Sequence, residues 1–248
     1  MATIAVYSVK GGVGKTTIAA SLAWCAATIS KRPTLLWDLD ASGGGGFVFG
    51  IEPPRRTRAA ALFAQEIEPA ELVQPTAFAN LSVLPADASL RALDAALLKL
   101  GKRRRLARLI ERLGTDYRRI VLDCPPVLNE VSAQIMRAAD VVVVPLTPSL
   151  LSLRALDQIR ADLTDNHKRH PPLLPVLSMV DRRRASHLEA IAKHPDWPAI
   201  PMASAVEQMA ARQAPVGVFA PGSAAAQAFA RLWAGVEKRL VEQQSARL

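Results

Sequence analysis

The chain has 248 residues, half of them hydrophobic and 21% charged, which excludes a disordered tail and leaves enough apolar side chains for a sizeable core. Lysines and arginines number 31 against 22 acidic residues, and this net charge of +9 suits a polyanionic partner, although a solvated basic surface explains it equally well. Two distant cysteines exclude a disulfide framework.

Short apolar runs alternate with helical stretches along the whole chain. The runs are almost continuously apolar, as expected of strands covered on both faces. Their repetition with helices predicts a single α/β domain over residues 1–248, with a doubly wound, mainly parallel sheet and helices on both faces. The predicted strands are 3–9, 34–38, 81–85, 119–124, 141–146, 173–180 and 199–202. The predicted helices are 15–29, 59–65, 90–113, 130–139, 150–167, 185–193, 205–212 and 224–242.

Two features bear on where the protein resides. The N-terminus lacks a basic leader and no apolar run approaches the length of a membrane span, which predicts a cytoplasmic protein. The last predicted helix carries an apolar stripe that we assign to the core rather than to a membrane anchor, formed by Phe229, Leu232, Trp233, Val236 and Leu240. The histidines show no metal-ligand spacing and are expected at the surface: His167, His170, His187 and His194.

The first predicted strand leads directly into VKGGVGKTT, residues 9–17, and then into a helix. In such a loop, glycines let backbone N–H groups surround phosphate oxygens, Lys15 neutralises the β and γ phosphates, and the Thr16 hydroxyl reaches Mg²⁺. This motif predicts ATP and Mg²⁺ as cofactors. The predicted nucleotide-binding residues in it are Lys10, Gly11, Gly12, Val13, Gly14, Lys15, Thr16 and Thr17.

The loop departs from the standard GxxxxGK[ST] pattern, because Val9 stands where the first glycine is expected and Lys10 follows it. This KGGVGKT form resembles the deviant Walker A motif of the ParA/MinD family of P-loop ATPases. The resemblance implies that Lys10 reaches across an ATP-dependent homodimer, in which nucleotide lies between the subunits, and adds positive charge to the partner's transition state. Lys10 and Lys15 are therefore expected to be catalytic.

Two further segments extend the resemblance. LLWDLD, residues 35–40, ends a strand and is similar to the family's DxD segment, with Asp38 and Asp40 expected on the same side of the strand. RIVLDCPP, residues 119–126, is similar to the family's Walker B. The resemblance implies Mg²⁺ ligation through Thr16, Asp38 and Asp123. Because Cys124 cannot act as a carboxylate base, it also implies that Asp40 positions the attacking water in a slow, partner-stimulated ATPase.

The resemblance covers roughly residues 2–240 and places the adenine ring near Met179 and Pro201. It also has departures. Four glycines at 43–46 stand in the family's switch I region and predict an unusually free loop. Residues without positive charge stand where DNA-partitioning members commonly carry arginine, namely Met202, Ala203 and Ala205.

Positive charge gathers elsewhere in three clusters. One is Arg182, Arg183 and Arg184. A second is a predicted basic helix that includes Lys102, Arg103, Arg104, Arg105, Arg108 and Arg112, and a third is Arg55, Arg56 and Arg58. The first cluster and residues 102–105 are candidate contacts for non-specific DNA binding. The basic helix is equally explained as a solvated face.

The sequence therefore predicts a ParA-like ATPase that partitions or positions a cargo, either DNA or a protein complex, with a ParB-like or other stimulating partner. Association with the nucleoid stays open. The alternatives are an ATP-dependent switch with little turnover, accessory to an envelope or polysaccharide-synthesis machine, and a MinD-like membrane-cycling ATPase. An iron–sulfur carrier is disfavoured, because two distant cysteines cannot supply paired thiolates.

Overall fold

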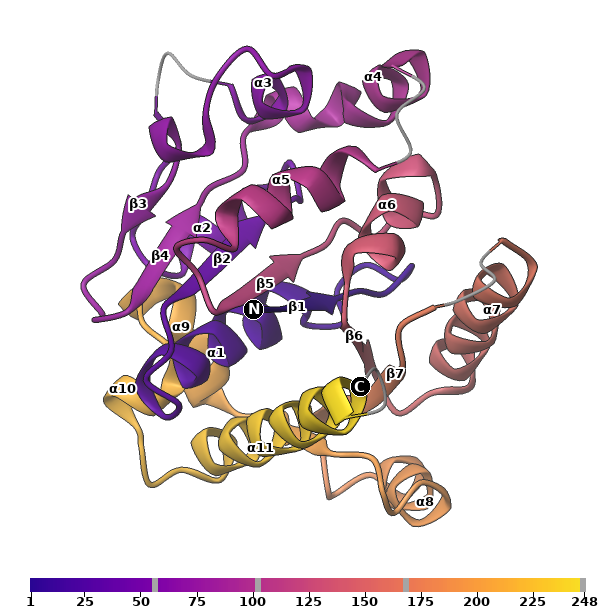
Figure 1. The fold of residues 1–248 in the computed structure, drawn as a ribbon. Coiled ribbons are helices and arrows are strands. Elements are labelled where there is room, and N and C mark those ends of the chain that lie inside the picture. The colour runs from indigo at the N-terminus through magenta and orange to yellow at the C-terminus, as the bar shows by residue number, and fades with distance from the viewer. Residues whose placement is uncertain (55–57, 101–103, 167–169, 246–248) are drawn as a thin grey trace.

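The computed structural model describes residues 1–54, 58–100, 104–166 and 170–245. The described residues form one eight-stranded sheet in the order β3-β4-β2-β5-β1-β6-β7-β8 (Figure 1). All neighbouring pairs are parallel except β3 with β4. The strands are β1 Ala2–Val6, β2 Thr34–Asp38, β3 Gln74–Pro75, β4 Leu81–Leu84, β5 Arg119–Asp123, β6 Val141–Leu146, β7 Leu173–Val180 and β8 Ala199–Pro201.

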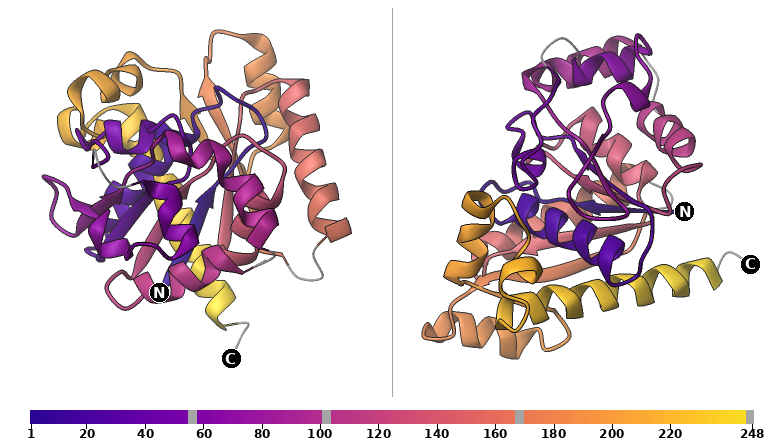
Figure 2. Two further views of the ribbon diagram at one scale, coloured as in Figure 1. Left: turned by 90° about the horizontal axis from the view of Figure 1, so that it is seen from above. Right: turned by 90° about the vertical axis from the view of Figure 1, so that its left-hand side faces the viewer.

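Helices cover both faces of the sheet, as the views in Figures 1 and 2 show. One apolar core joins the sheet to α1, α9, α10 and α11, and the other joins it to α3, α4, α5, α6 and α7. The helices are α1 Lys15–Thr28, α2 Gly44–Phe47, α3 Ala59–Ala64, α4 Leu93–Leu100, α5 Arg105–Leu113, α6 Glu130–Ala138, α7 Leu150–Asn166, α8 Ala185–Lys193, α9 Ser204–Arg212, α10 Val216–Phe219 and α11 Ala224–Ser245.

The predicted fold class is confirmed. The central strands are buried along their whole length, which is why they read as continuous apolar runs. The antiparallel strand β3 was not predicted. It contains only Gln74 and Pro75 and lies at the edge of the sheet, where a proline is tolerated because no neighbour needs its missing N–H.

The single helix predicted over 90–113 is wrong. The described residues form a 3₁₀ turn at Ala88–Ala92, then α4, then α5. Leu97 and Leu106 are both almost fully buried. They are nine residues apart, which at about 100° per residue would place them on opposite faces of one straight helix. Two helices with different axes allow both leucines to face the core.

The histidine prediction needs one correction. His187 is buried, and its Nδ1 accepts a hydrogen bond from the Asp181 N–H, so it fixes the turn before α8. His170 is exposed, and the half-exposed His194 stacks on Trp197 with 3.8 Å between the ring centroids. His167 lies outside the described residues.

The helix α11 packs along α1 and the sheet (Figure 2). The five apolar residues of the predicted stripe are all buried, which confirms the assignment of this helix to the core. None of the helices in the described ranges combines the length and the apolar character that a membrane crossing requires.

We expect Trp233→Ala to destabilise the fold strongly. The indole is 2% exposed and its Nε1 donates to the Ser30 hydroxyl at 2.9 Å, so truncation leaves both a cavity and an unpaired hydroxyl. Urea titration should give a loss of about 3–5 kcal/mol in the free energy of unfolding. Val241→Ala, at an exposed position of the same helix, is the control and should change it by less than about 0.5 kcal/mol. Equal effects of the two changes would contradict the core role of α11.

Candidate functional site

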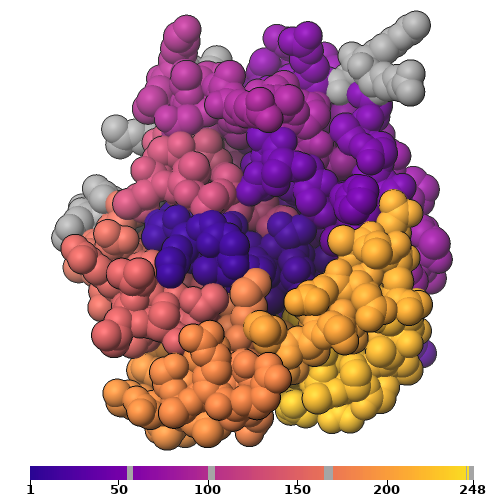
Figure 3. All heavy atoms as spheres, turned by 180° about the vertical axis from the view of Figure 1, so that it is seen from behind, coloured from indigo at the N-terminus to yellow at the C-terminus, as the bar shows by residue number. Residues whose placement is uncertain are grey.

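The strand register brings three chain segments to one edge of the sheet. Val6 at the end of β1 pairs with Asp123 at the end of β5, and Asp123 pairs in turn with Asp38 at the end of β2. The strands are parallel, so the loops that follow them leave the sheet side by side. In the view of Figure 3, the N-terminal residues reach the surface in the middle of one face, with later segments of the chain above and below them.

The loop after β1 is held in a tight turn at the start of α1. Gly14 precedes this helix with φ +85°, in the left-handed region that favours glycine. The Ser178 hydroxyl of β7 donates to the Val13 carbonyl at 2.9 Å, so the turn is tied to a strand two places away from β1 in the sheet. The geometry is that of a phosphate-binding loop followed by a helix N-terminus.

The Lys15 ammonium is buried within this loop. Its Nζ donates to the Lys10 carbonyl at 3.3 Å. Burial lowers the pKa of Lys15, and the negative charges of Asp123 and Asp40 offset part of that decrease. A buried cation beside a cradle of glycine N–H groups is poised to bind an anion.

Two carboxylates lie buried beside the loop. Asp38 is fully buried and accepts hydrogen bonds from the N–H groups of Asp40 and Gly45, at 3.0 and 2.7 Å. Asp123 is also fully buried, and neither of its carboxylate oxygens accepts a hydrogen bond from the described residues. Burial raises the pKa of both groups. The neighbouring charge of Asp40 raises the pKa of Asp38 further, and the charge of Asp38 raises that of Asp123. For Asp123, the nearby Thr16 hydroxyl and Lys15 offset part of the rise.

These residues fit a Mg²⁺ ion. Unpaired carboxylate oxygens in a buried site call for a cation, and a hydroxyl with one or two carboxylates is what Mg²⁺ takes from a protein when phosphates and waters complete its shell. No group of three or more His, Cys, Asp or Glu side chains suited to a metal occurs within the described residues. Thr16, Asp38 and Asp123 would thus hold the ion together with a nucleotide, not by themselves.

The glycine segment 43–46 differs from its prediction. Instead of a free loop it forms the short helix α2, with Gly45 and Gly46 buried. A Cβ at residue 45 would lie 3.0 Å from the Asp38 Oδ2, so any side chain there would require the carboxylate to give way. Asp40 lies beyond the end of β2 and is half-buried, with its Oδ1 accepting from the Ser42 N–H at 3.0 Å. The two aspartates therefore do not lie on one side of a single strand, as the sequence predicted, because β2 ends at Asp38.

An apolar cavity of about 120 Å³ adjoins the loop and α1. Met179 and Pro201, the two residues predicted beside adenine, both line it, as do Gly14 and Thr17 of the loop. Met179 has φ +55°, an uncommon value for a residue with a side chain. The sequence analysis did not predict the other residues that line the cavity, because they belong to no local motif. These residues are Ile18, Ile200, Met202, Ala203, Val206 and Phe229.

The predicted DNA contacts do not form one surface. Arg182, Arg183 and Arg184 are exposed after β7, although Arg183 pairs with Asp181 at 2.9 Å. Arg104 is exposed before α5, and Figures 1 and 2 show α5 far from α8.

The prediction of Arg105 as a DNA contact is wrong. It is 2% exposed and its Nε donates to the Phe63 carbonyl at 2.6 Å, so it is not free to meet a phosphate. Of the other predicted basic residues, Lys102 and Arg103 lie outside the described residues, as do Arg55 and Arg56.

Comparison with known proteins identifies a family and its relatives. A family model described as an AAA domain matches residues 1–174. The chain is 34% identical over 198 residues to the chromosome partitioning protein ParA of Caulobacter vibrioides, covering 77% of this chain and 73% of that protein. It is 32% identical over 158 residues to the sporulation initiation inhibitor protein Soj of Bacillus subtilis. That match covers 63% of this chain and 62% of Soj, so it spans less than two thirds of Soj's length.

Solved structures share the fold. Cobyrinic acid a,c-diamide synthase from Mycobacterium smegmatis, with a bound ATP analogue and magnesium, superposes with a TM-score of 0.73 at 28% identity. The superposition covers 82% of this chain and 86% of that one. A protein of similar fold thus binds the ligand pair that the P-loop motif predicts here.

We expect Asp123→Asn to stabilise the protein in EDTA and to remove its response to magnesium and nucleotide. The unfolded-state pKa of an aspartate is near 4 and burial raises the folded-state value, so the wild type loses stability as pH rises above about 4 while the neutral amide does not. At pH 7 the variant should melt at least about 3 °C higher, the shift expected for about 1 kcal/mol.

Differential scanning fluorimetry at several pH values measures this difference. The gap between the two melting temperatures should widen from pH 4 upward. Asp116→Asn, which changes an exposed carboxylate, is the control and should melt like the wild type. A wild type that melts above the Asp123→Asn variant in EDTA would contradict the expected strain between the two buried carboxylates.

Proposed function

The chain belongs to the ParA/Soj family of P-loop partitioning ATPases, and we propose that it binds Mg²⁺-ATP between two copies of itself and hydrolyses it slowly to position a cargo. The observation that carries this proposal is the buried pair Asp38 and Asp123 beside the buried ammonium of Lys15. Among the described residues, neither carboxylate oxygen of Asp123 has a hydrogen-bond partner. The proposed ATPase domain spans residues 1–248.

In this proposal each group of the site has a separate role. The loop N–H groups and Lys15 hold the phosphates, while Thr16, Asp38 and Asp123 hold the ion, which neutralises charge on the transferred phosphoryl group when bound. Asp40 positions the attacking water, since the residue after Asp123 is the buried Cys124, whose raised pKa keeps it a neutral thiol. Met179 and Pro201 enclose adenine.

Cargo and partners are proposed at a coarser level. The basic cluster 182–184 supports non-specific DNA binding at the nucleoid, in the cytoplasm, with a ParB-like or other partner that stimulates turnover. A partner-bound switch with little turnover is the competing function, and the measurements below distinguish the two. The apolar face of α11 is used by the core, so we do not propose this helix as a membrane anchor.

Asp40→Ala should bind ATP normally and accumulate as a dimer, because only the positioning of water is lost. We expect a fall in turnover of at least about 100-fold, in line with the loss of general-base assistance. Phosphate release and light scattering with Mg²⁺-ATP measure the two effects. Lys15→Ala serves as the non-binding control and should stay monomeric. Wild-type turnover in Asp40→Ala would remove the proposed role of Asp40.

Lys10→Ala should bind ATP but fail to dimerise. Its backbone carbonyl, which holds Lys15, survives the substitution, so the phosphate loop keeps its internal contact. Calorimetry should give an ATP affinity within about threefold of the wild type, equivalent to about 0.7 kcal/mol. Sedimentation with Mg²⁺-ATP should show monomer only. An ATP-dependent dimer as stable as that of the wild type would argue against a lysine acting across the interface.

Replacing Arg182, Arg183 and Arg184 with alanine should weaken binding to mixed-sequence duplex DNA equally for all sequences. Each lost phosphate contact should also reduce the slope of log K against log salt by about 0.9. Arg118, Arg154 and Arg160 offer a charge-matched triple variant outside the three basic clusters, since they too are exposed. Fluorescence anisotropy measures the DNA affinity and its salt dependence. Each triple variant also carries Asp40→Ala, and ATP is present, so that the dimer accumulates. Equal weakening by the two triple variants would indicate a general charge effect, and no binding by the unmodified chain would favour the switch.

A further inference from the structure

A buried tyrosine lies directly before the phosphate loop. Tyr7 follows β1 and is fully buried, with its N–H donating to the Val143 carbonyl of β6 at 3.0 Å. Its hydroxyl donates to the Val127 carbonyl at 2.6 Å. Burial raises the pKa of this phenol, which the neighbouring Ser132 hydroxyl lowers in part, so it remains a neutral donor. A buried hydroxyl is costly unless it is bonded, so a phenylalanine would suffice if only packing were needed.

The acceptor lies in the middle of the loop 125–129 that joins β5 to α6. One end of this loop is fixed where the Cys124 N–H donates to the Val6 carbonyl at 3.3 Å. Its other end is fixed at the start of α6, where the Asn129 side chain accepts from the Val131 and Ser132 N–H groups. Tyr7 holds the middle residue, from the strand that leads into the phosphate loop.

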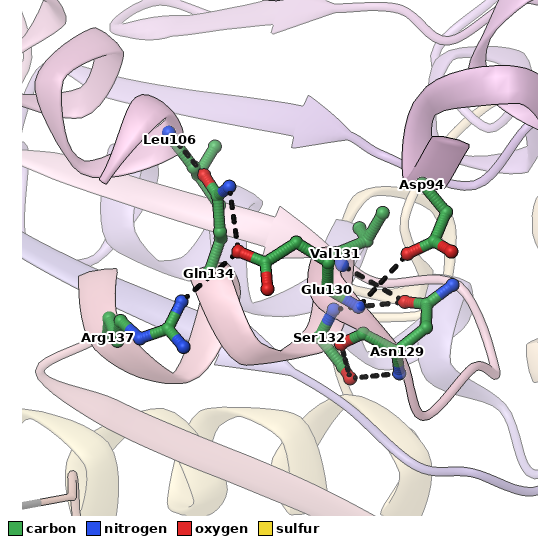
Figure 4. A network of polar contacts seen from close by, with 8 residues as sticks. All are labelled: Asp94, Leu106, Asn129, Glu130, Val131, Ser132, Gln134 and Arg137. Carbon is green, nitrogen blue, oxygen red and sulfur yellow. Dashed lines mark hydrogen bonds and ion pairs between the residues drawn. The ribbon is translucent and has the colours of Figure 1, made fainter. Parts of the chain in front are cut away.

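A polar network makes the α6 end of the loop rigid, as Figure 4 shows. The Glu130 N–H donates to Asp94 of α4 at 3.0 Å, and Gln134 accepts from the Leu106 N–H of α5 at 3.0 Å. These contacts tie α6 to the two helices that cover it. The network thus anchors the α6 end of the loop, while the Tyr7 hydroxyl bonds its central residue, Val127.

The loop forms one wall of a groove that contains Asp40. This groove has a volume of about 230 Å³ and is lined by Pro125, Pro126 and Val127 on one side and by Asp40 and Ala41 on another. Val127, whose carbonyl accepts from the Tyr7 hydroxyl, and Asp40 therefore line the same groove.

We infer that Tyr7 is a positioning residue whose hydroxyl fixes the loop 125–129 and so sets the geometry of the groove at Asp40. The part of this inference that concerns turnover rests on the proposed ATPase function. The part that concerns the loop does not.

Tyr7→Phe tests the inference, because it removes one oxygen and keeps the ring. The chain has two tyrosines, and Tyr117→Phe is the matched control at the opposite end of β5, with its ring half-exposed. Hydrogen exchange by mass spectrometry on peptides covering 124–132 should be about fivefold faster in Tyr7→Phe, the factor expected for one neutral hydrogen bond. Peptides from β1 and α1 should exchange as in the wild type. Tyr117→Phe should leave peptides 124–132 unchanged.

Steady-state hydrolysis of Mg²⁺-ATP gives the second measurement. We expect kcat to change at least threefold in Tyr7→Phe with KM, ATP affinity and melting temperature nearly unchanged, a split that a loss of packing alone would not produce. Unchanged exchange over 124–132 would overturn the inference, as would faster exchange with unchanged kcat, or a Tyr7→Phe chain that fails to fold. A wild type without turnover would count against the proposed function, and the exchange measurement would still decide whether Tyr7 holds the loop.

Discussion

The register between β2 and β5 is the constraint on which the site depends. It places the carboxylates of Asp38 and Asp123 next to each other at the ends of two buried strands, where water cannot solvate them. Two such charges are tolerated only beside positive charge, and Lys15 supplies part of it from the loop after β1. The close pairing of the two buried carboxylates thus follows from one alignment of strands, and the Asp123 oxygens that lack hydrogen-bond partners among the described residues lie within it. A slip of one residue would turn one carboxylate to the other face of the sheet.

Much of this arrangement could be predicted from local sequence. The strands β2, β6 and β7 have the predicted bounds because continuous apolar runs between turns leave few other options. The phosphate loop was predictable because its glycines and lysine act within one short segment. The walls of the apolar cavity beyond Met179 and Pro201 were not, since Val206 and Phe229 reach it from α9 and α11 through packing that no local pattern encodes.

The errors share a physical origin, which is tertiary packing that overrides local preference. Gly45 and Gly46 read as a free loop because glycine is permissive, yet they are buried where any side chain would collide with Asp38 or with the Ile51 carbonyl. Arg105 reads as surface charge, yet its guanidinium is turned inward to the Phe63 carbonyl. Because Arg105 is buried, the formal charge of +9 overstates the positive charge that the protein surface offers to a polyanion.

The contact between Gly45 and Asp38 has a mechanical consequence. A Cβ of residue 45 would lie 3.0 Å from the Asp38 Oδ2, and the same oxygen accepts a hydrogen bond from the Gly45 N–H, so a side chain at position 45 would crowd the carboxylate. Because α2 is a single turn that begins at Gly44, Asp38 lies directly against its backbone. Phe47, the last residue of α2, is nearly half-exposed. A larger residue at position 45 would therefore shift either a predicted Mg²⁺ ligand or the single turn of helix that carries this exposed ring.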